Sequence, residues 1–292
     1  MKRLLRLLSI ILLACITPFI TKAQQKSQNN KSLLWRISGK DMKTPSYLFG
    51  TIHLICPSDY VWTPKMKESL KKSQQVCFEM DMDDPGVLMK VATGLMDNSG
   101  KTLEDYFTPE QYKIVEAYMR DSMGMNIALF HNMKPAALQS MFTSKSAACE
   151  APVSYEEKIM DQAKKDKKEI IGLEQPEEQI ELFDNLPADS VVKDIMESIS
   201  GKNNDDEEYK KLVGAYKKQD LPALYKLLNS SGESSIDLAG FLDDRNKRWI
   251  ERMEDKMDQK SIFFAVGAGH LWGENGVINL LRKEGYKVVP IK

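Results

Sequence analysis

The chain is poor in histidine, with only three among its 292 residues. It also lacks an excess of positive charge, because 41 Lys and Arg residues are matched by 42 Asp and Glu residues, for a formal net charge of -1. This balance leaves no basic footprint for nucleic acid, so we expect no nucleic-acid partner. The hydrophobic share of 42% and the charged share of 28% are typical of a chain that folds around an apolar core.

Long apolar runs are missing except at the N-terminus. There, basic residues precede the apolar segment 7–20, and residues 21–23 resemble a cleavage site with small residues, which is the pattern of a secretory signal peptide. The run is too short and wrongly flanked for a membrane span. We therefore predict a signal peptide over residues 1–23 and an exported mature chain, periplasmic or secreted, without a membrane span. An alternative is a lipoprotein leader that anchors the chain at Cys15.

Cysteine is also scarce, and only Cys56, Cys77 and Cys149 remain after the leader is removed. Export permits disulfides, so one bonded pair with a free thiol and no pair at all are both compatible with the sequence. The spacing of the three residues matches no zinc knuckle. We expect a buried apolar role for each of them.

Strand patterns occur at both ends of the mature chain. Residues 33–38 and 45–54 are apolar runs separated by a glycine-containing turn, which predicts a hairpin. Segment 63–73 opens with Thr63 and Pro64, a cap and first-turn pair that predicts a helix, and segment 75–82 is expected to be the strand that closes a β-α-β arrangement. At the other end, the pattern is strand, helix and strand, over 261–270, 276–285 and 286–291.

The middle of the chain is mostly helical in its periodicity. The sequence therefore predicts an α/β (α+β) fold whose central mixed sheet is built from N- and C-terminal strands. We find no domain linker and no repeat beyond two short histidine motifs, and we expect a single domain over residues 24–292. Helices are predicted over 108–122, 134–147, 154–168, 176–186, 212–228 and 236–257, with a short strand over 169–174 and a polar surface stretch, a loop or a helix start, over 200–211.

Two of the three histidines lie in the same short sequence motif. Gly50 to His53 and Gly267 to His270 are both Gly-x-x-His, and each follows an apolar strand pattern. A glycine at a strand end, here Gly50, Gly267 or Gly269, permits a sharp turn and close approach of a neighbour. Ligand sites gather at strand ends in α/β sheets, and imidazole is both the commonest metal ligand and a natural acid or base. The pair therefore predicts one site with two imidazoles, against the alternative of two unrelated histidines.

A carboxylate completes this candidate site. Glu79 lies in the apolar stretch "CFEMD", where an ionised group is costly unless it is paired, and Asp81 would face the same side of a strand. The alternative is an edge-strand glutamate that faces solvent. Two histidines and one glutamate resemble an open metal site with room for water and substrate. His131 has no motif and is expected in a loop.

The sequence as a whole resembles the TraB/GumN family, which is related to the Tiki proteases and more distantly to the erythromycin esterases. The resemblance runs over nearly the whole mature chain, and it implies a metal-dependent hydrolase-like fold with peptide cleavage proposed for the Tiki branch. The esterase branch implies the same residues as acid and base without a metal. The stretches that carry it are "SYLFGTIHL", "CFEMD", "TLEDYFTPEQY", "KPAAL", "IIGLEQPEEQ", "DDRNKRW" and "FFAVGAGHLWGENGVINLLRKEGYKVVPI".

The resemblance also assigns further residues. It places the family's Arg-Asn pair on Arg245 and Asn246, and its Gly-Leu-Glu stretch on Glu174. Arg245 is expected to clamp an anionic substrate or orient Glu79, or else to be a solvated helix charge. Glu174 is expected to accept from a histidine or to cap the next helix. The family's Gly-x-Asp is replaced here by Ser-Tyr-Glu, so a role for Glu156 rests on an arm one methylene longer.

These patterns predict a hydrolase that cleaves a peptide or small ester substrate with a divalent metal, Mn, Co or Zn. His53, His270 and Glu79 are the expected ligands and catalytic groups, and Arg245 is expected to steady developing negative charge. The alternative is a non-catalytic regulator that sequesters a peptide in the same site.

Overall fold

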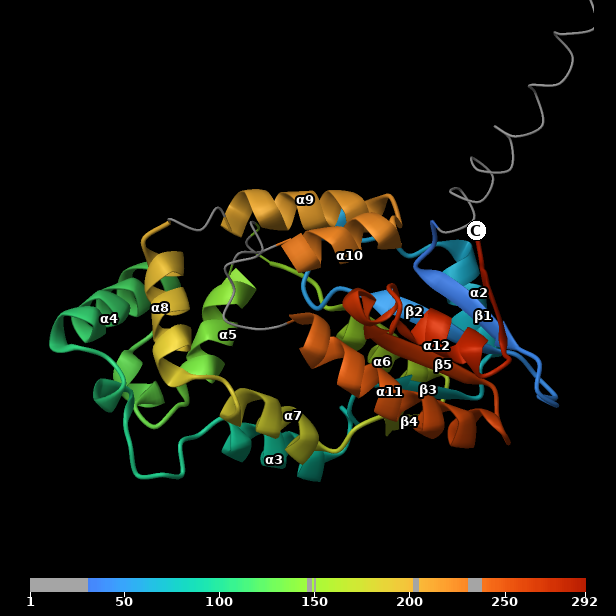
Figure 1. Ribbon diagram of the computed structural model, residues 1–292, viewed down its shortest axis with the longest axis horizontal. Coiled ribbons are helices and arrows are strands. Elements are labelled where there is room, and N and C mark those ends of the chain that lie inside the picture. Colours follow the sequence, from blue (N-terminus) through green and yellow to red (C-terminus); the bar gives the residue numbers. More distant parts are fainter. Residues whose placement is uncertain (1–30, 146–148, 150, 202–204, 231–237) are drawn as a thin grey trace, which may run out of the picture.

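The computed structural model describes residues 31–145, 149, 151–201, 205–230 and 238–292 (Figure 1). The predicted signal peptide and Cys15 lie outside these residues. The described chain has an α/β body around one sheet and a helical lobe beside it (Figure 1). None of the helices in the described part combines the length and the apolar character that crossing a membrane requires.

The body is built on a six-stranded sheet with the order β4-β3-β5-β2-β1-β6. The four strands β4, β3, β5 and β2 are parallel to one another, whereas β1 is antiparallel to both β2 and β6. The expected mixed sheet from both ends of the chain is therefore confirmed. The strands are β1 (Leu34–Ser38), β2 (Ser46–Thr51), β3 (Gln75–Phe78), β4 (Glu169–Gly172), β5 (Ile262–Gly267) and β6 (Lys287–Pro290).

The body's helices cover both faces of the sheet. α2 (Pro64–Lys72) and α6 (Tyr155–Lys165) lie behind the sheet, while α11 (Leu238–Met257) and α12 (Val277–Lys283) lie in front of it (Figure 1). Right-handed crossovers between parallel strands produce this division. The start of α2 follows the predicted cap, because the Thr63 side chain accepts from the Met66 N–H and Pro64 occupies the first turn.

The core of the body is the continuous apolar layer between these helices and the sheet. All six residues of β2 and five of the six in β5 are buried, as expected for central strands of a sheet that is covered on both faces. Phe49 on β2 packs at a ring distance of 5.4 Å from Trp62 and 6.1 Å from Phe263 on β5. Because this layer is dense, the strand ends that carry the motifs have a rigid base.

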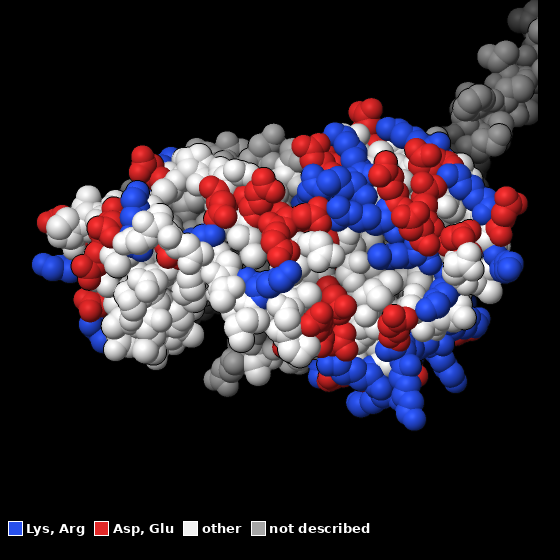
Figure 2. Space-filling model, turned by 90° about the horizontal axis from the view of Figure 1, so that it is seen from below, with Lys and Arg blue, Asp and Glu red and all other residues white. Residues whose placement is uncertain are grey.

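The helical lobe has a second, separate apolar core. Leu103, Val115, Met119, Leu138 and Ile195 are fully or almost fully buried in it. Charged side chains are denser over the body than over this lobe on the face that Figure 2 shows. The helices of this part of the chain are α3 (Pro85–Gly94), α4 (Pro109–Met123), α5 (Pro135–Lys145), α7 (Pro176–Asp184) and α8 (Ala188–Ile199). Two further helices, α9 (Asp205–Lys217) and α10 (Leu221–Ser230), follow them in the chain.

Three details of the predicted fold are wrong. The segment 212–228, predicted as one helix, is divided between α9, which ends at Lys217, and α10, which begins at Leu221. The strand expected over 75–82 ends at Phe78, so Glu79 lies beyond the ladder and the strand alternation that paired it with Asp81 does not apply. Two of the three cysteines are not buried apolar residues, because Cys56 and Cys149 form a disulfide and are only half-buried. Cys77 is free and fully buried in β3, as expected.

Candidate functional site

The two Gly-x-x-His motifs lie side by side. Their strands, β2 and β5, are neighbours, and Gly50 is paired with Val266 and Thr51 with Gly267 in the parallel register. Both histidines therefore follow the carboxyl ends of adjacent parallel strands, where α/β sheets place their ligands. The strand on the other side of β5 is β3, whose end is followed by Glu79.

The chain packs closely where these strand ends meet, and the packing restricts Gly50 most. A Cβ atom on Gly50 would lie 3.0 Å from Leu271 Cδ2 and 3.1 Å from Ala268 Cα, closer than ordinary van der Waals contact. A Cβ atom on Gly269 would lie 3.0 Å from Leu228 Cδ1. The Gly267 N–H donates to Glu79 Oε1 at 2.9 Å, so this glycine holds the carboxylate through its backbone.

His270 is buried and its ring is fixed on both sides. Its Nδ1 lies 2.7 Å from Asn246 Oδ1, while Asn246 Nδ2 donates to the carbonyls of His270 at 3.3 Å and Asn275 at 2.9 Å. Since the asparagine's NH₂ group is used by the two carbonyls, its oxygen accepts from Nδ1–H, and Nε2 keeps the lone pair. The Trp249 ring packs against the imidazole at 4.2 Å.

Arg245 joins the candidate residues into one network. Its Nε donates to the two Glu174 oxygens at 3.0 and 3.2 Å, and its Nη2 donates to Glu174 Oε2 at 2.8 Å and Glu79 Oε2 at 2.6 Å. Its Nη1 lies 3.3 Å from His270 Nε2. Arg245 is only 4% exposed, so it is not the solvated helix charge that the sequence left open. Glu174 pairs with Arg245 and contacts neither histidine, and the cap of α7 is Gln175.

Glu79 is held as a carboxylate in this network. Burial raises its pKa, but the charges of neighbouring groups, Arg245 among them, and the Gly267 N–H outweigh burial and hold the pKa well below its ordinary value. Its Oε1 lies 3.8 Å from His270 Nε2, and its side chain is 17% exposed. Glu79 is therefore an ionised group at the edge of a buried cluster, not a solvent-facing residue of an edge strand.

His53 occupies a different environment from His270. Its side chain is 78% exposed, and its Nδ1 lies 3.3 Å from Glu156 Oε1. The hydrogen bond to Glu156 raises the pKa of His53, and the Glu79 charge acts in the same direction. Glu156 Oε2 in turn accepts from Ser154 Oγ at 3.0 Å. The longer arm of Glu156 thus reaches the histidine of the first motif, and the sequence did not reveal this pairing.

The structure forms two groups from the predicted residues. Arg245 connects one group, and the other is the pair of His53 and Glu156. Among the described residues, no three His, Cys, Asp or Glu side chains are gathered closely enough to hold a metal as they stand. The three-ligand set therefore stays a prediction. The first group consists of Glu79, Glu174, Arg245, Asn246 and His270.

Sequence reasoning gave no role at the site to Trp249, and it included Gln179 only as part of a stretch that carries the family resemblance. Trp249 lies four positions after Arg245 on α11, so the two share a helix face, and the Arg245 guanidinium lies 5.0 Å from the Trp249 ring. Gln179 Nε2 donates to Glu174 Oε2 at 3.1 Å, which extends the network onto α7. The i,i+4 spacing was the only signal for Trp249.

Other parts of the molecule lie apart from this site. His131 is an exposed loop residue whose Nδ1 lies 2.9 Å from the Ala128 carbonyl. A cavity of about 370 Å³ in the helical lobe is lined by Tyr106, Lys134 and Phe183 among others, and none of its lining residues belongs to the histidine site. Neither His131 nor this cavity belongs to the candidate site.

Acid is expected to destabilise the fold through His270. Burial lowers the pKa of His270 from 6.5 to about 3, so between these values the unfolded chain binds a proton that the folded chain does not. The free energy of unfolding should then fall as pH falls through this window, by at most about 1.4 kcal/mol per pH unit. Urea titrations between pH 6.5 and 4.5 would measure the slope.

A His270→Gln variant provides the control for this slope. Its free energy of unfolding should change less steeply with pH than that of the wild type over the same range. His53 contributes little well below pH 6.5, because its pKa is raised in the folded state and it is then protonated in both states, and its contribution near pH 6.5 is common to the two proteins. Parallel curves for the two proteins would contradict a neutral buried His270.

The sequence model of the TraB/PrgY/gumN family matches residues 33–290. The chain belongs to this family. It is 26% identical to the protein named Metalloprotease TIKI homolog of Amphimedon queenslandica, over 98% of this chain and 67% of that relative. It is 25% and 24% identical to the proteins named Metalloprotease TIKI1 of Xenopus tropicalis and Homo sapiens, over 92% and 91% of this chain and 63% of each relative. The chain thus spans about two thirds of the length of these relatives, and no solved structure matches it.

Proposed function

We propose that this protein is an exported hydrolase that cleaves peptide or ester bonds with the help of a divalent metal. The observation that carries the proposal is the position of the two motif histidines and the hydrogen-bond partner of Nδ1 in each ring. Each follows one of two adjacent parallel strands, and each has its Nδ1 next to an oxygen acceptor, Asn246 for His270 and Glu156 for His53. Metal-binding histidines are oriented in this way by partners of their second ring nitrogen. The relatives named metalloproteases support the same reading.

The residues fit a metal by their chemistry. Two imidazoles and one carboxylate make the three-ligand set of open catalytic sites, and His53, His270 and Glu79 would hold the ion. Binding through His270 Nε2 requires that this atom give up its 3.3 Å contact with Arg245 Nη1. When bound, a divalent cation lowers the pKa of a water molecule and polarises a carbonyl group. The metal's identity, Mn, Co or Zn, is left to measurement.

The chain's own groups divide the remaining work. Glu79 is ionised and partly exposed, so in the alternative in which it is not itself a ligand it can accept a proton from an attacking water. Arg245 stays charged beside it and is placed to stabilise negative charge that develops on a carbonyl oxygen. Glu174, which is fully buried, holds the guanidinium in place through both of its oxygens.

Export is supported by the disulfide. Cys56 and Cys149 are bonded, and such bonds persist mainly in oxidising compartments. Together with the leader-like residues 1–23, this favours a periplasmic or secreted protein. We expect the substrate to be a peptide or small ester that meets the protein in that compartment.

Metal retention tests the proposal directly. Wild-type protein purified in the presence of Mn, Co and Zn salts should hold about one equivalent of metal per chain by elemental analysis. A His53→Ala, His270→Gln double variant should lose the metal and the hydrolysis of a peptide mixture followed by mass spectrometry. His131→Ala, which changes the histidine outside the site, should retain both.

The same mass spectra separate the alternative function. A regulator that sequesters a peptide would leave the mixture intact while retaining affinity for one of its members. Arg245 gives this alternative no support, because its guanidinium is 4% exposed and already pairs with Glu79 and Glu174. Cleavage by the wild type that the double variant lacks would rule it out.

A further inference from the structure

We infer that the Cys56–Cys149 disulfide is a positioning device for the candidate site. Cys56 lies three residues after His53, and Cys149 lies seven residues before Glu156. The bond therefore ties the loop that carries the first motif histidine to the segment that carries its carboxylate partner. The part of this inference that concerns metal binding rests on the proposed function, whereas the positioning of His53 against Glu156 does not.

A backbone bridge supports the same connection. The Ile55 N–H donates to the Val153 carbonyl at 3.0 Å, and the Val153 N–H donates to the Ile55 carbonyl at 2.8 Å. Ile55 is fully buried, so this bridge is shielded from water. The disulfide and the bridge together form a two-part clamp within a few residues of His53 on one chain segment and of Glu156 on the other.

The His53–Glu156 pair does not fix the two segments by itself. Its atoms are 3.3 Å apart, and the histidine side chain is 78% exposed, although that of Glu156 is only 9% exposed. Because one partner faces solvent, the pair is partly screened and does not replace a covalent tie. The disulfide joins residues 93 positions apart, and a cross-link over such a separation removes much of the freedom of the two segments.

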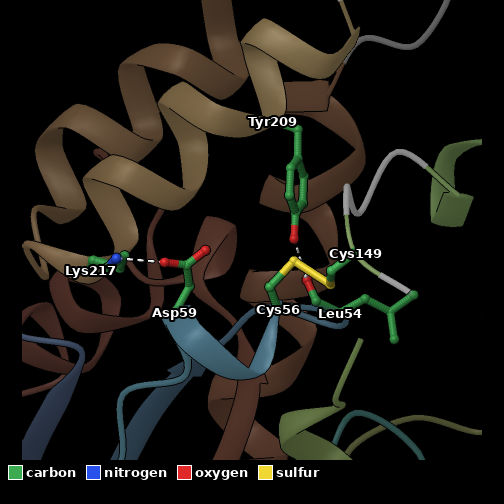
Figure 3. Close-up of a disulfide and its surroundings, with 6 residues drawn as sticks. All are labelled: Leu54, Cys56, Asp59, Cys149, Tyr209 and Lys217. Carbon is green, nitrogen blue, oxygen red and sulfur yellow. Dashed lines mark hydrogen bonds and ion pairs between the residues drawn. A yellow bond between two sulfur atoms is a disulfide. The ribbon is translucent and has the colours of Figure 1, made fainter. Parts of the chain in front are cut away.

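Other contacts of this loop connect it to α9. Figure 3 shows that Tyr209 and Lys217, both on α9, approach the loop beside the disulfide. The Tyr209 hydroxyl donates to the Leu54 carbonyl at 3.2 Å, and Lys217 pairs with Asp59. These contacts anchor the loop to α9 and do not reach Glu156. On the far side, the Tyr155 hydroxyl bonds to Val61. Near His53, the disulfide and the bridge are the covalent and backbone ties between the two segments, beside the side-chain interactions of Glu156 with His53 and Thr51.

The half-buried position of the cysteines separates this role from a core role. Neither Cys56 nor Cys149 belongs to the buried apolar core, whereas the free Cys77 does. Loss of the disulfide should therefore loosen the strand-end loop while the sheet beneath it stays folded. A purely stabilising cross-link would instead change the whole domain without a local effect at His53.

Hydrogen exchange tests the positioning without metal or substrate. In a Cys56→Ser, Cys149→Ser variant of the full mature chain, backbone exchange measured by mass spectrometry should accelerate in peptides that cover residues 53–56 and 151–156. Peptides from β5 should be unchanged. A Lys217→Met variant, which removes the Asp59 pair from the same loop, should not accelerate exchange at 151–156.

Titration with Co²⁺ alone gives the second readout. The serine variant should bind Co²⁺ at least about 10-fold more weakly than the wild type, because losing the partner that orients a ligand histidine has an effect of this size. The Lys217→Met variant should bind Co²⁺ as the wild type does. If the serine variant does not fold, wild-type protein that is reduced while folded, alkylated and desalted takes its place.

The outcomes separate the two proposals. Accelerated exchange at 53–56 and 151–156 with no Co²⁺ binding even by the wild type upholds the positioning role and overturns the metal. Unchanged exchange at these segments, with only a lower melting temperature, overturns the positioning role whatever the metal result.

Discussion

Replacing Arg245 with methionine is expected to lower the free energy of unfolding by about 3–5 kcal/mol, because the change leaves two carboxylates without their buried counter-charge. Arg245 is 4% exposed, and Glu174 is fully buried beneath it. Its guanidinium donates to both Glu174 oxygens and to Glu79 Oε2. Denaturant titration followed by circular dichroism would measure the loss.

Arg252 offers a matched control on the same helix. It also makes a two-fold contact with a carboxylate, to Glu178 at 2.8 and 3.0 Å, but its side chain is 35% exposed. Arg252→Met should therefore cost only about 0–1 kcal/mol. Equal losses for the two variants would contradict a special role for burial. Adding Glu174→Gln to Arg245→Met should recover part of the stability, since one of the stranded charges is then removed.

The size of this expected effect follows from how the site is built. The strand ends position His270 and Glu79, whereas the positive charge that neutralises the carboxylates comes from Arg245 on α11. On that helix, Arg245 binds the carboxylates and Asn246 binds the His270 ring. Stability and chemistry are therefore coupled in one buried network, as is common where ionised groups are kept out of water.

The positions of the two motif histidines could be predicted because they follow from local pattern, whereas Glu79 was expected within a strand and lies just beyond its end. Apolar runs that end in glycine mark the ends of β2 and β5, and the order of strands and helices favours neighbouring parallel strands. The insertion of β5 between β2 and β3 was not predictable from either segment alone. It is this insertion that brings His270 between the two other strand ends.

The pairings within the site depend on contacts that sequence pattern does not carry. Arg245 and Glu174 are 71 residues apart, and Arg245 lies among several exposed charges, so nothing local distinguishes it. Three cysteines allow several pairings, and only the folded chain selects Cys56 with Cys149. The Glu156 contact arises for the same reason, since the Ile55–Val153 bridge draws two distant segments together.

The two carboxylates that share Arg245 differ in exposure, which divides their roles. Glu174 has no exposed side-chain surface, whereas Glu79 is 17% exposed and also faces His270. Glu174 is thus enclosed as a support for the guanidinium. Glu79 remains reachable by water and substrate, so the proposed chemistry belongs to it.

Paired substitutions are expected to separate these roles. Glu79→Gln should reduce peptide hydrolysis by about 10²–10⁴-fold, the contribution of a positioned general base, with little loss of stability because Arg245 keeps its bonds to Glu174. Glu174→Gln should lower the free energy of unfolding by about 1–3 kcal/mol through weaker charged hydrogen bonds, with a smaller effect on turnover. Initial rates on one peptide found to be cleaved, together with urea titrations, would measure both. Full turnover by Glu79→Gln would remove Glu79 from the chemistry, and the hydrolase proposal would then need another base.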